Sequence, residues 1–252
     1  MRSTRALGRG WQRFMTGLRS AGAALMDAVY PRGIVCLCCA MPSHGALLCQ
    51  DCREEIERLR LQEPLCPLCG HPTENGRCGF CHGQVPGRMR AVWRHTGAAR
   101  TLVHRLKHGA MADSAAVMAE AMADEALSLS LPEDTVVTWV AMPAARRRVR
   151  GIDHGRVLAQ AVAARLGLPC QGLLARREEG RTQQGLDRQA RLTNLKDGFA
   201  CVGLLKAPVL LVDDVMTTSA TARACAECLL KAGAPSVTVL TATQAGSRFT
   251  DD

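Results

Sequence analysis

The fold class of this chain is decided by the run Val209-Leu-Leu-Val-Asp213-Asp214-Val-Met-Thr217-Thr218-Ser219-Ala-Thr221. Its four apolar residues predict a buried strand that ends at Val212, with two carboxylates directly after it. Hydroxyl residues follow, and the Ala-rich stretch from Ser219 to Lys231, closed by Gly233, predicts a helix. A strand, a turn and a helix N-terminus in this order are typical of α/β proteins, which bind ligands beyond the carboxyl ends of their strands.

The residues of this run suit a sugar phosphate. A helix start offers free backbone N–H groups and the positive end of the helix dipole to a phosphate. The hydroxyls add donors, and the carboxylates can accept from ribose hydroxyls directly or through Mg²⁺. Two other interpretations compete: acids that only cap a helix, and the acidic strand end of a nucleotide hydrolase. The second also requires a Gly-x4-Gly-Lys-Ser/Thr loop, which the sequence lacks.

Cysteine is the second informative feature, with 13 in 252 residues. Eight of them form four Cys-x2-Cys pairs near the N-terminus, separated within each pair of pairs by nine and eight residues. This is the spacing of zinc ribbons, in which two short knuckles supply four thiolates to a tetrahedral site. We therefore predict two structural Zn²⁺ ions, one held by the first four cysteines and one by the last four: Cys36, Cys39, Cys49 and Cys52, then Cys66, Cys69, Cys78 and Cys81.

Several alternatives for the cysteines stay open at this point. Cys38 stands beside Cys39 and makes the first pair ambiguous, and the pairing of knuckles between the two sites is not fixed. Iron–sulfur ligation uses the same thiolates. A disulfide-rich secreted module is disfavoured because we expect no signal peptide before the cysteines. Cys225 and Cys228 lie on one face of the expected helix, where small packing residues are the simpler interpretation.

Charge and hydropathy limit the possible partners. The net charge of +9 and the pI near 9.1 suit phosphate-rich partners such as a pyrophosphate ligand or nucleic acid. Aromatic residues make up only 3% of the chain, which argues against a broad base-stacking platform. No apolar run reaches the roughly 18–20 residues that cross a bilayer. We therefore expect no membrane span and a cytoplasmic location.

Three regions follow one another along the chain. We expect a helical lead at residues 1–33, a double zinc ribbon at 34–85 with a helix at 51–61, and a larger domain at 86–252. In the larger domain, strands at 89–94, 135–142, 172–175, 208–212 and 236–242 are expected to alternate with helices at 98–108, 114–129, 156–166 and 219–231. This alternation predicts an α/β fold with a parallel sheet flanked by helices.

Four ordered segments, together with the eight cysteines, resemble the ComF family, in which a double zinc ribbon precedes a type I phosphoribosyltransferase-like domain. The resemblance runs from about Cys36 to about Thr243. The family's Leu-Lys-Tyr-x-Gly, Arg-Gly-Phe-Asn-Gln and Gln-x-x-Leu…Arg-x-x-Asn…Phe segments are matched in order by Leu106-Lys107-His108-Gly109, by Arg150-Gly151-Ile152-Asp153-His154, and by Gln183, Leu186, Arg191, Asn194 and Phe199. The run at 209–221 is similar to the loop that binds phosphoribosyl pyrophosphate (PRPP) in type I phosphoribosyltransferases.

The resemblance implies a PRPP site that works with Mg²⁺. The ribose would contact Asp213 and Asp214, and the 5′-phosphate would contact Thr217, Thr218, Ser219, Ala220 and Thr221. Arginines at 146–150 would meet the pyrophosphate or form a solvated face, and the polar segment 176–195 resembles a loop that closes over substrate. The chain departs from the family at Ser219, where Gly is usual, and at Val140-Ala-Met-Pro143, where Val-Pro-Val-Pro is usual.

Three functions agree with this pattern. The resemblance favours an accessory protein of DNA uptake and natural transformation, whose zinc ribbons contact single-stranded DNA or a competence helicase. The second function is an active phosphoribosyltransferase, a glycosyltransferase of nucleotide salvage, with an acceptor base that the sequence does not identify. The third is a regulator that binds PRPP and signals through the zinc ribbons.

Overall fold

A computed structural model describes residues 33–62, 64–109, 111–143, 152–176 and 198–245. The chain divides into two compact units between Arg53 and Glu54. The first unit carries the first four knuckle cysteines, and the second carries the last four together with the sheet. The expected helical lead lies outside the described residues except for its last residue, and the expected domain boundary at residue 85 stays a prediction.

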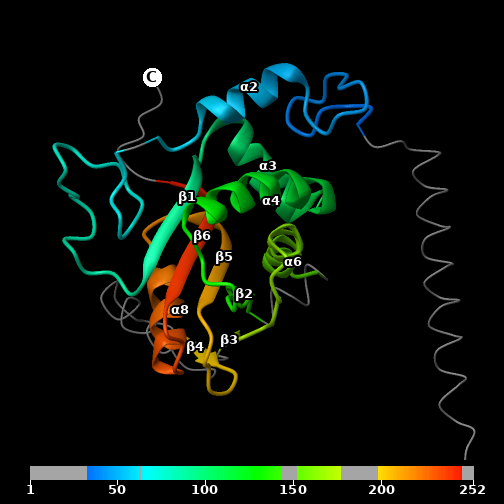
Figure 1. Cartoon of the computed structure of the whole chain (residues 1–252). Coiled ribbons are helices and arrows are strands. Elements are labelled where there is room, and N and C mark those ends of the chain that lie inside the picture. The colour runs from blue at the N-terminus through cyan, green and yellow to red at the C-terminus, as the bar shows by residue number, and fades with distance from the viewer. Residues whose placement is uncertain (1–32, 63, 110, 144–151, 177–197, 246–252) are drawn as a thin grey trace, which may run out of the picture. The chain divides into compact units, whose positions relative to one another are not determined.

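A parallel four-stranded sheet forms the centre of the second unit (Figure 1). The strand order is β1-β6-β5-β2, and all three neighbouring pairs run parallel, as the alternation of elements predicts. The strands are β1 (Arg88–Arg94), β2 (Val136–Trp139), β5 (Val209–Met216) and β6 (Val237–Gln244). A separate antiparallel pair consists of β3 (Leu174–Arg176) and β4 (Phe199–Cys201), of which β4 was not predicted.

Helices follow the strands at the predicted places. Their bounds agree with the sequence-based ranges to within a few residues: α2 (Gln50–Arg58), α3 (Gly97–His108), α4 (Met111–Ser128), α6 (His154–Leu166) and α8 (Ala220–Lys231). Helix α6 begins after Asp153, whose side chain accepts from the backbone N–H of Arg156, and ends at Gly167 in the left-handed conformation. His154 is therefore the first residue of this helix.

The sheet is buried on both faces. Leu211 of β5 and Val239 of β6 share one apolar cluster with Cys225 and Leu229 of α8. Leu210 and Leu240 are also fully buried but alternate to the opposite face, where α4 and α6 contact the sheet (Figure 1). The predicted arrangement of a parallel sheet flanked by helices is therefore confirmed.

Strand β5 is longer than the sequence suggests. The apolar run predicts an end at Val212, but the strand continues to Met216 and therefore includes both carboxylates. The reason is the neighbouring strand β6, which still pairs with Asp213 through Thr241 and with Met216 through Gln244. Cross-strand pairing in the sheet thus extends the strand beyond the point at which its apolar run stops. Strand β2, by contrast, covers only the middle of the expected range 135–142.

The second zinc-ribbon segment is hydrogen-bonded to strand β1. The backbone N–H of Met89 donates to the carbonyl of Leu68 at 2.7 Å, and the guanidinium of Arg90 donates to the carbonyl of Cys66 at 2.9 Å. Within the described ranges, no helix is long and apolar enough to cross a membrane.

Candidate functional site

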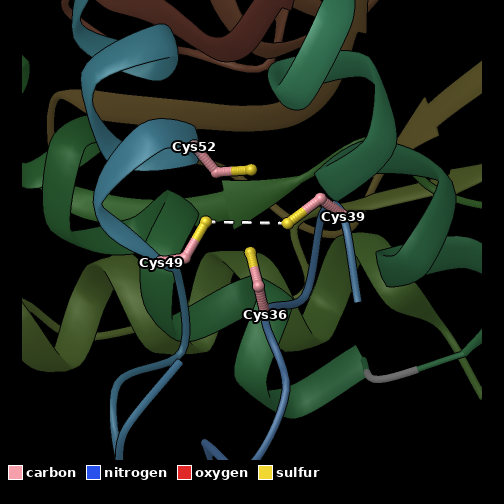
Figure 2. Close-up of side chains that lie close together, drawn as sticks. All are labelled: Cys36, Cys39, Cys49 and Cys52. Atoms are coloured by element: carbon pink, nitrogen blue, oxygen red, sulfur yellow. Dashed lines mark hydrogen bonds between the residues drawn. The ribbon is translucent and has the colours of Figure 1, made fainter. Parts of the chain in front are cut away.

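The eight predicted cysteine ligands meet in two four-sulfur clusters. The sulfur atoms of each set lie within 4.8 Å of one another: Cys36, Cys39, Cys49 and Cys52 in the first, and Cys66, Cys69, Cys78 and Cys81 in the second. Figure 2 shows the first set converging from the loop of Cys36 and Cys39 and from the start of α2, with 3.6 Å between the sulfurs of Cys39 and Cys49. Four thiolates about 2.3 Å from one Zn²⁺ lie about 3.8 Å apart in a tetrahedron, so the clusters fit that ion.

The first knuckle of each cluster has the same backbone hydrogen bonds. The carbonyl of Cys36 accepts from Ala40, and the carbonyl of Cys66 accepts from Gly70, each at 3.0 Å. The backbone N–H of each of these two cysteines donates at 2.8 Å to the residue five positions later. The structure also resolves the first ligand pair, because Cys39 rather than Cys38 joins the cluster.

The thiols are crowded in a way that favours a cation. Burial raises the pKa of Cys69 well above its ordinary value, and the neighbouring thiols of Cys78, Cys81 and Cys66 raise it further. In the same cluster burial also acts to raise the pKa of Cys78, but hydrogen bonds from the backbone of Cys81 and Phe80 outweigh it and lower that pKa to about 7. Burial likewise raises the pKa of Cys52, as do its three partners. A bound Zn²⁺ relieves this repulsion and stabilises the thiolates, so its affinity is coupled to folding.

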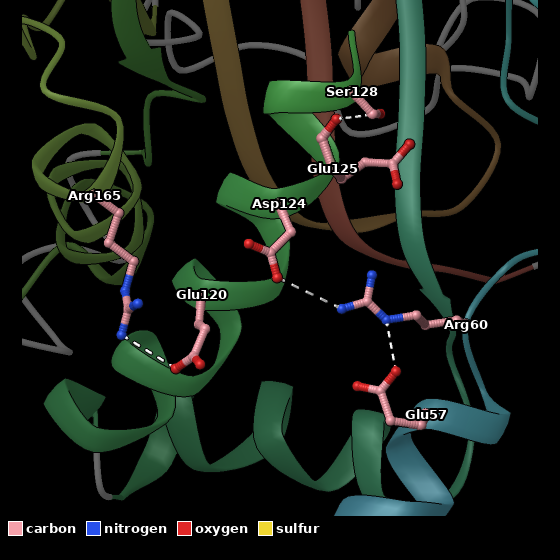
Figure 3. A network of polar contacts seen from close by, with 7 residues as sticks. All are labelled: Glu57, Arg60, Glu120, Asp124, Glu125, Ser128 and Arg165. Atoms are coloured by element: carbon pink, nitrogen blue, oxygen red, sulfur yellow. Dashed lines mark hydrogen bonds and ion pairs between the residues drawn. The ribbon is translucent and has the colours of Figure 1, made fainter.

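Ion pairs between α4 and its neighbours form a second polar cluster. Figure 3 shows Arg60 between Glu57 and Asp124, at 2.9 and 3.9 Å, and Arg165 beside Glu120 at 3.2 Å. The acidic side chains are about 60% exposed, and exposed pairs of this kind contribute little energy. We therefore assign this cluster to the surface of the helical layer rather than to a binding site.

The carboxyl end of β5 carries the two predicted ribose-binding carboxylates. Because successive strand residues alternate, Asp213 and Asp214 face opposite sides of the sheet. Asp214 is only 5% exposed, whereas Asp213 is less deeply buried. The backbone N–H of Asp214 donates to Oδ1 of Asp213 at 2.9 Å, which fixes one carboxylate relative to the other.

Two basic side chains from other elements meet at Asp214. Nζ of Lys107, near the end of α3, lies 3.0 Å from Oδ1. Nε2 of His154, at the start of α6, lies 3.2 Å from Oδ2, within ion-pair distance but outside hydrogen-bond geometry. The first, second and fourth segments of the family resemblance thus converge on one carboxylate. Sequence reasoning did not name Lys107 or His154 as site residues, although both belong to those segments.

The backbone of Asp214 is held as well. The hydroxyl of Thr243, on β6, donates to the Asp214 carbonyl at 3.1 Å. Its oxygen lies 2.9 Å from Nδ1 of His95 and is therefore free to accept from that nitrogen. Burial lowers the pKa of His95, and the nearby charge of Lys107 lowers it further, which favours a neutral ring. A chain of contacts thus connects the end of β1 to the acid pair.

The two carboxyls differ in acidity. Burial raises the pKa of Asp214, but the contacts with His154 and Lys107 outweigh burial and bring it below its ordinary value. Burial, followed by the charge of Asp214, raises the pKa of Asp213 to about 7. Near neutral pH, therefore, Asp214 is an anion and Asp213 is divided between its neutral and ionised forms.

The predicted phosphate loop leads from the acid pair into α8. Thr217 and Thr218 are exposed, Ser219 is buried, and Ala220 and Thr221 begin the helix. Ser219 has φ 59° and ψ 0°, the left-handed conformation, and no described residue is a hydrogen-bond partner of its hydroxyl. Glycine adopts this backbone freely, which gives a physical reason for the usual Gly at this position.

Other predicted positions divide into described and undescribed ones. Asp153, in place of the family's Asn, caps α6 and accepts from Trp139 Nε1 at 3.2 Å. Both residue types are good N-caps. Phe199 is buried in β4. The arginine run at 146–150 lies outside the described residues, as does most of the segment 176–195, including Gln183, Leu186, Arg191 and Asn194.

Comparisons with known proteins agree with these features. Residues 25–85 match the family model for a double zinc ribbon domain. The chain is 32% identical over 222 residues to the DNA utilization protein YhgH of Salmonella typhi, covering 81% of this chain and 94% of that protein. It is 27% identical over 207 residues to competence protein F of Haemophilus influenzae, covering 76% and 88%.

Solved structures with a partial likeness include the orotate phosphoribosyltransferase of Aeropyrum pernix, at 22% identity and a TM-score of 0.35, covering 57% of this chain and 64% of that one. The relatives in sequence, by contrast, cover 81% and 76% of this chain. The chain therefore belongs to the ComF family, which includes the DNA utilization protein YhgH and competence protein F.

Proposed function

We propose that the protein is a cytoplasmic accessory factor of DNA uptake or utilisation that binds PRPP, or a related phosphoribosyl ligand, with Mg²⁺. The observation that carries the proposal is the pair of carboxylates, Asp213 and Asp214, near the carboxyl end of β5, which a short loop connects to the N-terminus of α8. Ligands of parallel α/β sheets bind at this end of the strands.

The parts of the ligand have matching groups in this arrangement. The free N–H groups at the start of α8 suit the 5′-phosphate, with Thr217, Thr218 and Thr221 as additional donors. The acid pair suits ribose hydroxyls and Mg²⁺, which prefers carboxylate and phosphate oxygens. The residues from Asp213 to Thr221 follow the family's order except at Ser219, where Gly is usual.

Calorimetric titration of PRPP with Mg²⁺ into the zinc-loaded protein tests the ligand. We expect saturable binding by wild type and loss of binding in the double variant Asp213→Asn/Asp214→Asn. Glu133→Gln is the matched control, because Glu133 is an exposed acid that precedes β2 at the opposite end of the strands. Absence of binding by wild type would refute the phosphoribosyl site.

The zinc ribbons are proposed to bind a second partner, which is single-stranded DNA or a competence helicase. Support comes from the net charge of +9 and from relatives named for DNA utilization and competence. Phosphate contacts release counterions, so affinity for a single-stranded oligonucleotide should fall linearly on a log–log plot against salt. Fluorescence anisotropy across a salt series measures this slope, and an affinity that does not respond to salt would contradict the proposal.

A pyrophosphate-release assay separates PRPP binding from catalysis. The acid pair and phosphate loop also suit an enzyme that transfers the phosphoribosyl group to a base. Pyrophosphate release from PRPP in the presence of purine and pyrimidine bases would identify the chain as a phosphoribosyltransferase. Binding without release with every base would leave ligand binding as the function of the site.

A further inference from the structure

We propose that the two carboxylates have different tasks: Asp213 accepts from the ribose hydroxyls, whereas Asp214 is an internal anchor held by Lys107 and His154. Lys107 and His154 are then positioning residues rather than ligand contacts. This inference rests on the proposed phosphoribosyl site, and it concerns which carboxylate that site offers to the sugar.

The contacts of Asp214 leave little room for a sugar. Its side chain is 7% exposed, and each oxygen has a basic partner, Lys107 at 3.0 Å and His154 at 3.2 Å. Its carbonyl accepts from Thr243, and its N–H donates to Asp213. A ribose hydroxyl that replaced Lys107 or His154 would leave the nearly buried carboxylate of Asp214 without one of its basic partners, which is unfavourable.

Asp213 has the opposite situation. It alternates to the face of β5 that packs against α8, the face of Leu211 and Cys225. Its charge acts on Cys225, whose pKa is raised by burial and then by Asp213. It is more exposed than Asp214, and Oδ1 accepts a single backbone N–H. A carboxylate has about four acceptor positions, so Asp213 retains capacity for hydroxyl donors on the side of α8.

The position of α8 makes this arrangement useful. A phosphate at the N-terminus of α8 and a carboxylate on the α8 face of β5 lie on the same side of the sheet. One ligand with a phosphate and vicinal hydroxyls can meet both. Lys107 and His154 approach from α3 and α6, on the other side of the sheet. Their ion pairs with Asp214 fix the end of β5 relative to these helices.

Sugar phosphates with and without the hydroxyls test the division of tasks. We would measure the affinities of ribose 5-phosphate and 2,3-dideoxyribose 5-phosphate for the zinc-loaded protein by calorimetry. At about pH 8.5, where Asp213 is ionised, wild type should prefer the hydroxylated sugar by about tenfold or more, the value expected for hydrogen bonds to a charged acceptor. Asp213→Asn should remove most of the preference, and Asp214→Asn should retain it.

The outcomes distinguish this inference from the proposed function. If wild type binds neither sugar phosphate, the phosphoribosyl site itself is refuted, and this inference with it. If wild type binds but Asp214→Asn loses the preference, alone or together with Asp213→Asn, only the division of tasks is refuted. Zinc content and the urea midpoint of each variant verify that it folds.

Variants of Lys107 give a second test in case Asp214→Asn does not fold. Lys107→Met should weaken ribose 5-phosphate binding several-fold, Lys107→Arg should restore it, and binding of inorganic phosphate, followed by ³¹P NMR, should be unchanged in both. In a double-mutant cycle, the effect of Lys107→Met should largely disappear in the Asp214→Asn background. Weaker binding of inorganic phosphate by Lys107→Met would show that Lys107 contacts the ligand and would refute its positioning role.

Discussion

Replacement of Ser219 by Gly should stabilise this protein, although the residue lies in the proposed phosphate loop. Ser219 has the left-handed backbone conformation at the entry to α8, with φ 59°. Only 6% of its surface is exposed. Its hydroxyl has no hydrogen-bond partner among the described residues. Two unfavourable features, one of the backbone and one of the side chain, thus coincide at one position.

The expected gain follows from these two features. A left-handed conformation costs a residue with a Cβ about 1–2 kcal/mol, and a buried hydroxyl without a partner costs about 1–3 kcal/mol. Glycine loses about 0.5–1 kcal/mol through its greater freedom in the unfolded chain, and removing the side chain sacrifices roughly 0.8 kcal/mol of burial. The free energy of unfolding should therefore increase by about 1–2 kcal/mol in Ser219→Gly.

Urea denaturation with excess Zn²⁺, followed by circular dichroism, measures the difference. The slope with urea should stay constant while the midpoint rises. Ser219→Ala separates the two features, because it removes the hydroxyl but keeps the left-handed strain and the buried Cβ. By these magnitudes it should lie within about 1 kcal/mol of Ser219→Gly, and both variants should be more stable than wild type. A Gly variant less stable than wild type would refute the reasoning.

Three further predictions concern the metal, the acid pair and a tight turn. Cys36→Ser and Cys66→Ser should each lower the zinc content from two ions per chain to about one, as measured by elemental analysis, since each belongs to a separate four-sulfur cluster. Because the pKa of Asp213 is raised to about 7 from 3.8, its ionisation opposes folding: the free energy of unfolding should fall between pH 4 and pH 7, by roughly 3–4 kcal/mol at most. Asp213→Asn should remove this dependence in parallel urea titrations, and an identical pH profile in the variant would contradict the raised pKa. Gly87→Ala should destabilise the protein by more than about 2 kcal/mol, because its Cβ would collide with the carbonyl of Val237. Gly83→Ala, also at positive φ but with open space around it, should cost only about 1 kcal/mol; equal effects of the two substitutions on the thermal midpoint would show that the collision is not decisive.

The sequence predicted most of the elements because their signals are local. The apolar runs around Leu210 and Val239 and the Ala-rich stretch ending at Lys231 are each recognisable within a dozen residues. The end of β5 was placed too early for the same reason: pairing with β6 extends the strand to Met216, and its partner there, Gln244, is 28 residues further along the chain. The short strand β4 likewise depends on pairing with β3 and has little signal of its own.

The candidate site shows the same division between features with a local sequence pattern and features that depend on tertiary contacts. Residue type and spacing identified the eight cysteines, and together with the family resemblance they predicted a role for the acid pair and the hydroxyl loop, because thiolate knuckles and a strand–acid–helix run are patterns of nearby residues. Lys107 and His154 became site residues only in the folded chain, where α3 and α6 bring them within about 3 Å of Asp214. The unequal acidity of Asp213 and Asp214 was equally inaccessible, since burial and neighbouring charges determine it. Sequence by itself determined which chemical groups this protein contains and in what order. Tertiary structure decided which of these groups lie close enough to form ion pairs and to shift each other's pKa, because electrostatic interactions depend on distance and burial rather than on position along the chain.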